Sequence, residues 1–380
     1  MATPLRAPMI DMVRGLALVM IFINHVPGNP LETLTSRNFG FSDATELFVF
    51  LAGYSAATAY GRAVERDGAV RTGLRVWGRA FRLYVLHLFT LLLASAIVAA
   101  ASLWSGDPHF LEWINLGPLF SDPAATLVGV VLLGHQAGYF NILPLYVVLL
   151  LGTPLLLAGL RRWPGTTVTA AAALYLGTQW TGINLPAFPG DGAWFFNPLA
   201  WQMMFVAGAW CGDRARRGLP VVESHPLMLG GAVLLLLVAL AMKLGEYYPS
   251  PDDLPLPFFV YGQEKTFVTL PRLLHALALL YVGRHLARRF LGRPPGTVGL
   301  CLALIGRQGL AVFCLGSVLA IAAQAFLFIT DAGAVLECAI IGLGIGLQLG
   351  LAWLISWHSG ALAATAAAPR WRLRWLSSSR

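Results

Sequence analysis

Two ionisable residues, Arg14 and His25, lie in an otherwise apolar segment near the start of the chain. They are eleven residues apart, so a helix would carry both on one face, about 16 Å apart along its axis. Imidazoles act as general bases, and guanidinium groups stabilise developing negative charge. The pair is therefore a candidate for acid–base chemistry, and a structural, hydrogen-bonded histidine is the alternative interpretation of His25.

Two carboxylates, Asp43 and Glu46, stand three residues apart at the expected start of a second helix. Asp43 follows a serine and suits helix capping. Glu46 lies one turn deeper, and we expect it, or Asp43, to orient the His25 imidazole as in other general-base pairs. Tyr54 follows on the same segment as a candidate substrate-lining residue, although the small residues around it also favour close helix packing.

Three arginines, Arg75, Arg79 and Arg82, follow one another at helical spacing before a third apolar segment. Guanidinium groups suit phosphate, so these residues are candidates for binding an anionic cytosolic ligand. The alternative is that they snorkel to the membrane surface and set the topology. Weaker polar candidates for substrate binding stand at the ends of later apolar segments: Asn141, Tyr146, Trp201, Gln202, Lys265, Arg272, His275 and Arg307.

The composition predicts that lipid surrounds these residues. Hydrophobic residues make up 57% of the 380 positions and charged residues only 12%, about half the usual share in soluble proteins. The net charge of +8 follows from membrane topology, so we expect no nucleic-acid partner. The four cysteines lie in apolar segments without a C-x-x-C pair, and no metal site is predicted. The first apolar run lacks a cleavage site and is interpreted as a retained helix.

The hydrophobic pattern predicts an all-α, polytopic transmembrane helical bundle of about ten helices with both termini in the cytoplasm. The spans are expected at about 8–26, 44–61, 83–104, 141–160, 166–182, 197–212, 226–243, 270–286, 303–328 and 334–356. Most of the 26 lysine and arginine residues then fall in cytoplasmic loops. The stretch 124–134 is too short to span and predicts a re-entrant or interfacial piece. Residues 1–358 form one membrane domain, and 359–380 form a basic cytoplasmic tail.

Several motifs resemble those of a known family. Arg14 and His25 resemble the R-x10-H motif of the membrane acyltransferase-3 superfamily. The stretches 46–54 and 79–84 are similar to its acidic-FFxLSG-aromatic and R-x-x-R motifs, although Ala52 replaces the usual serine and excludes a hydroxyl nucleophile there. The longer segments 24–29, 37–44, 135–146 and 197–202 resemble the OpgC family, and the likeness covers nearly the whole chain.

The resemblance implies an inner-membrane enzyme that transfers succinyl groups from cytosolic succinyl-CoA to osmoregulated periplasmic glucans. It places the family's histidine at His25 and its arginine at Arg14, and implies no tightly bound cofactor. The donor phosphates are then expected near the three arginines of 75–82. Lys265, Arg272 and Arg307 are unranked candidates for holding the succinyl carboxylate. Acylation of another envelope polysaccharide, with an acetyl or other group, and secondary transport are the alternatives.

Overall fold

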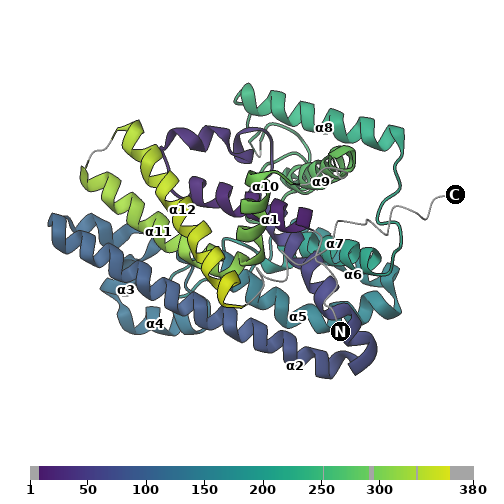
Figure 1. Cartoon of the computed structure of the whole chain (residues 1–380), viewed down its shortest axis with the longest axis horizontal. Coiled ribbons are helices and arrows are strands. Elements are labelled where there is room, and N and C mark those ends of the chain that lie inside the picture. Colours follow the sequence, from purple (N-terminus) through teal and green to yellow (C-terminus); the bar gives the residue numbers. More distant parts are fainter. Residues whose placement is uncertain (1–7, 251, 291–294, 331–332, 360–380) are drawn as a thin grey trace.

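The computed structural model describes residues 8–250, 252–290, 295–330 and 333–359, without the side chains of 8 and 288–290. Apart from Ser359, the predicted C-terminal tail lies outside these residues. The described chain is helical, with one isolated β-bridge between Pro186 and Ala193 and no strand, which confirms the all-α class (Figure 1).

Most helices match predicted spans in position, but the span expected at 303–328 is divided at Gln308 between two helices. They are α1 (Pro8–Asn24), α2 (Ala44–Ser105), α3 (Gly117–Ser121), α4 (Pro123–Val131), α5 (Ile142–Arg162), α6 (Pro164–Thr181), α7 (Pro198–Arg216), α8 (Pro226–Leu244), α9 (Leu270–Phe290), α10 (Thr297–Arg307), α11 (Gly309–Thr330) and α12 (Ala334–His358). Four short 3₁₀ helices are η1 (Pro30–Leu34), η2 (Ser36–Asn38), η3 (Pro108–Asn115) and η4 (Phe258–Val260). The nine residues of α4 are too few to cross a bilayer.

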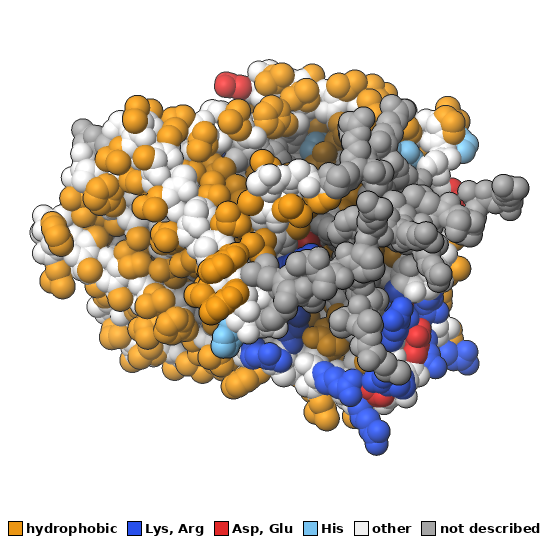
Figure 2. Space-filling view, in the orientation of Figure 1, with side chains coloured by type: hydrophobic (Ala, Val, Ile, Leu, Met, Phe, Trp, Pro, Cys, Tyr) orange, Lys and Arg blue, Asp and Glu red, His pale blue; other side chains and the backbone are white. Residues whose placement is uncertain are grey.

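Among the described residues, five helices are long and apolar enough to cross a membrane: α2, α5, α8, α11 and α12. Apolar side chains cover much of the face seen in Figure 2, and the basic side chains gather at its lower right. A water-soluble domain rarely exposes so much apolar surface. The chain is therefore a membrane protein, while the count of ten spans and the side of the termini stay predictions.

The segment between the second and third predicted spans is helical instead of a loop. The helical assignment of α2 runs through 62 residues and is interrupted only in backbone angles at Gly68, with φ 80° and ψ 168°. Glycine adopts positive φ at little cost, so the chain reverses there within a single residue. In Figure 1, α2 descends from the centre, turns at the lower right and runs along the lower edge. Arg75, Arg79 and Arg82 consequently lie on this helix and are exposed.

The first half of α2 packs against α7 through small residues, as predicted around Tyr54. A Cβ atom on Gly53 would lie 1.9 Å from the Phe205 carbonyl oxygen, and one on Gly208 would lie 1.9 Å from that of Phe50. The two backbones thus touch directly, which is how helices associate within a bilayer. This contact fixes α7 beside the N-terminal end of α2, where the candidate site lies.

Candidate active site

His25 follows the last residue of α1 and lines a cavity of 560 Å³, here called the His25 cavity. The other walls come from segments 40–45, 138–142 and 263–265, with contributions from α9 and α11. The His25 ring packs on the Tyr139 ring, with 4.3 Å between centroids, and Gln324 Nε2 donates to the His25 carbonyl oxygen at 2.5 Å. In the described part of the chain, the ring nitrogens of His25 form no hydrogen bond. The imidazole is therefore held by its contact with the tilted Tyr139 ring, and its ring nitrogens are available to a substrate.

The two carboxylates near the start of α2 do not orient this imidazole, contrary to expectation. Glu46 is fully buried, and its Oε1 accepts hydrogen bonds from Arg272 Nε at 2.8 Å and Nη2 at 2.5 Å. Its Oε2 accepts from the Asp43 amide at 2.9 Å, and Asp43 Oδ1 accepts from the Thr45 amide at 2.7 Å. The pair forms a capping box. Glu46 serves Arg272 because a buried guanidinium requires a counter-charge.

Lys265 reaches the capping box from the segment that precedes α9. Its Nζ donates to Asp43 Oδ2 at 2.6 Å and to Thr45 Oγ1 at 3.2 Å. Burial would raise the pKa of the Asp43 carboxyl, but the charges of Lys265 and Arg272 outweigh it and hold that pKa well below its usual range. Asp43 is therefore ionised at neutral pH, and the ion pair ties the 263–269 segment to α2.

The segment that carries Lys265 is held by its own backbone carbonyls. Five consecutive carbonyl oxygens accept hydrogen bonds from surrounding groups: those of Glu264, Lys265, Thr266, Phe267 and Val268 accept from Thr269 N, Trp201 Nε1, Asn197 N, Gln179 Nε2 and Tyr175 OH, in that order. Each of these carbonyls is therefore paired within the protein. Residues 264–268, here called the strap, therefore present their side chains in fixed directions.

The charged lining of the His25 cavity is strongly unequal. Besides His25, its ionisable wall residues are one acid and four bases: Asp43, Arg37, Lys243, Lys265 and Arg272. Two carboxylates outside the lining pair with two of these bases: Glu46 with Arg272, and Glu32 Oε1 with Arg37 Nη2 at 2.8 Å. Counting these two carboxylates, four bases face three acids, and the surplus of one positive charge favours an anionic ligand.

Three of the weaker predicted residues lie in or beside this cavity. Asn141 lines it at the start of α5. His275 Nδ1 lies 2.7 Å from Ser42 Oγ, and its ring fills the space where a Cβ on Gly40 would stand. Tyr146 OH donates to the Phe48 carbonyl at 3.0 Å. Asn141 can thus contact a ligand, whereas His275 and Tyr146 support the cavity walls.

Other predicted residues are structural in their observed contacts. Trp201 is fully buried, does not line the cavity, and supports Lys265 from behind. Gln202 Nε2 donates to the Ala171 carbonyl at 2.8 Å and joins α7 to α6. The backbone of Tyr54 lies against Gly212 of α7. Arg75 Nη1 pairs with Asp67 Oδ2 at 2.9 Å beside the Gly68 reversal.

Arg14 lies outside the His25 cavity, near the opposite end of α1. It donates to Asp11 Oδ1 at 3.3 Å, to the Gly306 carbonyl at 3.4 Å and to the Leu51 carbonyl at 3.3 Å, and it also contacts Ser55 Oγ. Arg307 Nε lies 3.5 Å from the other Asp11 oxygen. Arg14 and Arg307 thus join α1 to α2 and α10, and the structure does not bring either to His25.

Sequence reasoning missed several residues of the cavity. Tyr139 was noted only as part of the 135–146 resemblance, and its φ of 66° follows from no sequence signal beyond the preceding Gly138. Lys243 ends α8 with its Nζ 5.0 Å from the Tyr248 ring centroid, and Arg37 lies between the first two helices. Nothing in their local patterns indicates that they meet His25, because only the tertiary fold brings these segments together.

The fold and the site define a polytopic membrane protein with a basic, histidine-bearing cavity. The chain belongs to the OpgC protein family, whose sequence model matches residues 6–360. No curated protein and no solved structure matches the chain. Membership of this family indicates an acyltransferase that modifies glucans.

Proposed function

We propose that the protein transfers a succinyl group from cytosolic succinyl-CoA to hydroxyl groups of osmoregulated periplasmic glucans, within the bacterial inner membrane. The observation that carries this proposal is the position of His25, with free ring nitrogens, in a cavity lined by four basic side chains and one carboxylate. A general base beside an anion-binding wall suits an acyl donor that ends in a carboxylate.

In the proposed reaction, a ring nitrogen of His25 removes the proton of a glucan hydroxyl. The hydroxyl oxygen attacks the thioester carbonyl, an ester bond forms, and the carbon–sulfur bond breaks. The imidazolium then returns its proton to the departing CoA sulfur. Contact with the Tyr139 ring restrains the imidazole through both transfers.

Lys265 is the preferred residue for the succinyl carboxylate. Its ammonium group has three N–H donors, and Asp43 and Thr45 engage two of them. The third is available to a ligand in the cavity. Arg272 is engaged by Glu46, and Arg307 lies outside the cavity beside Asp11, so both are weaker candidates.

The developing oxyanion requires a donor inside the cavity. Arg14 was expected in this role, but its guanidinium contacts Asp11, Leu51 and Ser55 away from the cavity wall. We therefore assign the role to the Asn141 side-chain amide, which lines the cavity with His25. The exposed guanidinium groups of Arg75, Arg79 and Arg82 are the proposed contacts for the donor phosphates.

The test compares His25→Ala with His109→Ala, a matched variant at an exposed histidine outside the cavity. Both proteins are expected in the membrane at wild-type level. Glucans from cells with His25→Ala are expected to lack succinate half-esters, and those from His109→Ala to carry them. Normal succinylation with His25→Ala would refute the proposed base. Proton-coupled flux by purified wild-type protein in liposomes, without turnover of succinyl-CoA, would favour transport instead.

A further inference from the structure

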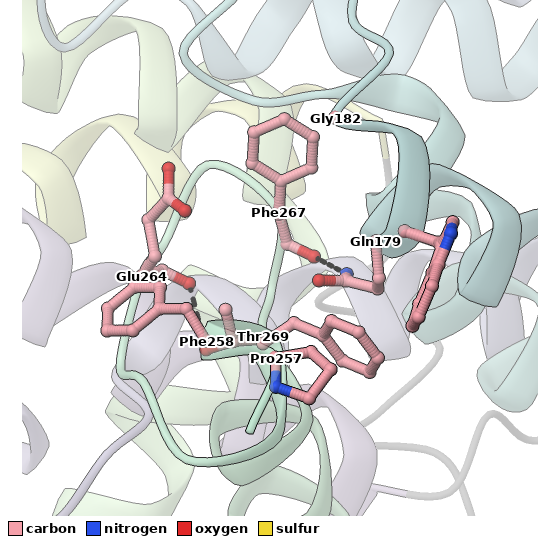
Figure 3. A pocket seen from close by; sticks show the side chains of 9 residues that line it. Gln179, Gly182, Pro257, Phe258, Glu264, Phe267 and Thr269 are labelled. Atoms are coloured by element: carbon pink, nitrogen blue, oxygen red, sulfur yellow. Dashed lines mark hydrogen bonds between the residues drawn. The ribbon is translucent and has the colours of Figure 1, made fainter. Parts of the chain in front are cut away.

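A second cavity lies on the other side of the strap. It has a volume of 410 Å³ and is here called the aromatic pocket. Its walls come from the end of α6, from η4 and from the segment before α9, and they include Gln179, Trp180, Pro257, Phe258, Glu264 and Phe267. Figure 3 shows Phe267 beside Gln179, Glu264 across from them, and Pro257 and Phe258 closing the lower edge.

The strap connects the two cavities residue by residue. Glu264 and Phe267 line the aromatic pocket, whereas Gln263 and Lys265 line the His25 cavity. Consecutive residues have Cα atoms about 3.8 Å apart, so the cavities are separated by little more than one thickness of chain. A ligand that occupies both cavities must therefore be chain-like and several sugar units long.

The lining of the aromatic pocket selects a different ligand from that of the His25 cavity. Its ionisable lining residue is Glu264, and no lysine or arginine lines it. An anionic donor is disfavoured by this carboxylate. Rings of Phe258, Phe267 and Trp180 offer flat apolar surface to the C–H faces of a sugar. The carboxylate of Glu264 can accept charge-assisted hydrogen bonds from sugar hydroxyls.

The pocket is built before any ligand arrives. The ring of Phe258 occupies the space that a Cβ on Gly262 would need, with 2.4 Å between them. Thr269 Oγ1 donates to the Gly262 carbonyl at 2.7 Å, and Gln179 Nε2 donates to the Phe267 carbonyl at 2.5 Å. These contacts fix the aromatic rings relative to the strap, which reduces the ordering cost of binding.

We propose that the aromatic pocket binds a neutral glucose unit of the acceptor chain at a distance from the unit that is acylated. This inference rests on the proposed glucan acceptor. It makes the strap a divider with an acyl-donor side and a sugar side, and it predicts that longer acceptors bind more tightly than short ones.

The experiment measures the binding of a β-linked glucose disaccharide and a hexasaccharide to the purified full chain by calorimetry, without donor. Wild-type protein is expected to bind the hexasaccharide at least about tenfold more tightly. Glu264→Gln and Trp180→Ala are each expected to lower hexasaccharide affinity by about tenfold and to leave disaccharide affinity unchanged. Asp252→Asn and Trp163→Ala are the matched controls, because both residues are exposed and lie outside the pocket.

Equal affinity for both sugars, or full hexasaccharide affinity in both pocket variants, would overturn the inference. Trp180 is 75% exposed, so its side chain could serve only to anchor the protein in lipid. In that case Trp180→Ala would alter reconstitution into bilayers without altering sugar affinity, and this result would also overturn the inference. Succinyl transfer is assayed separately. Length-dependent sugar binding without transfer would refute the proposed reaction alone, whereas transfer with unchanged binding in the variants would refute the pocket alone.

Discussion

Trp201 Nε1 donates a hydrogen bond to the main-chain carbonyl of Lys265 at 3.1 Å, from a side chain that is fully buried in α7. The indole thus acts on the cavity without entering it. It fixes the strap at the residue whose ammonium group faces Asp43. Since α7 is itself locked to α2 by Gly53 and Gly208, the position of Lys265 depends on helix packing deep in the bundle.

Trp201→Phe keeps an aromatic ring but removes the indole donor, so the Lys265 carbonyl keeps only its hydrogen bond from the Val268 amide. Losing one hydrogen bond costs about 0.5–1.5 kcal/mol, so a modestly lower melting temperature is expected. Movement of Lys265 is expected to raise the KM for succinyl-CoA more than it lowers kcat. Trp210→Phe on the same helix is the control. Unchanged KM with a lowered melting temperature would show that Trp201 is merely structural.

The sequence allowed the helices to be predicted because membrane spans must be long, apolar and internally hydrogen-bonded. The region 62–82 was predicted as a loop because its arginines and glycines break the apolar pattern. In the structure only Gly68 leaves helical backbone angles. The rest of the region is helical because an exposed arginine-rich helix satisfies its backbone hydrogen bonds as well as an apolar helix does. Polarity marks the edge of a span but not the end of a helix.

The site was less predictable than the fold. Helical spacing predicts Arg14 and His25 on one helix, but α1 ends at Asn24 and His25 is the residue after it. Two groups about 16 Å apart also belong to separate surroundings. Glu46 was expected to contact His25 because the two residues stand at neighbouring ends of consecutive predicted helices. Arg272, which is distant in the sequence, instead donates a hydrogen bond to the Glu46 carboxylate. That contact depends on how α9 packs against α2. Ion pairs between remote segments have no local signal.

Lys265→Met is expected to change donor choice. Losing a hydrogen bond to a charged group costs about 1.5–3 kcal/mol, so the KM for succinyl-CoA is expected to rise about 10- to 100-fold. Acetyl-CoA has no terminal carboxylate, so any turnover of this donor is expected to change less. The measurement is thioester turnover with both donors. Arg307→Met is the control, since Arg307 lies outside the cavity; equal losses for the two donors would contradict the assignment of Lys265.

Glu46→Gln distinguishes a structural carboxylate from a catalytic one. Breaking a buried ion pair by removing one partner costs about 3–5 kcal/mol, so unfolding in detergent is expected at markedly lower temperature. Because Glu46 contacts Arg272 and not His25, the shape of the pH–rate profile of the surviving enzyme is expected to stay unchanged. A shifted profile with normal stability would instead restore the predicted role of orienting His25.

Asp43→Asn tests the ion pair with Lys265 while preserving the helix cap, because asparagine caps as well as aspartate. Burial alone would raise the pKa of Asp43, but the positive charges of Lys265 and Arg272 lower it by more than burial raises it. The folded-state pKa therefore lies well below the unfolded value of about 3.9. Such a group stabilises the fold fully above the unfolded pKa and loses that contribution as pH falls toward the folded pKa. Wild type is therefore expected to melt higher than Asp43→Asn at neutral pH, and the gap is expected to shrink below about pH 4. The measurement is the melting temperature of both proteins across this range. A gap that widens on acidification would contradict an ionised Asp43 held by Lys265.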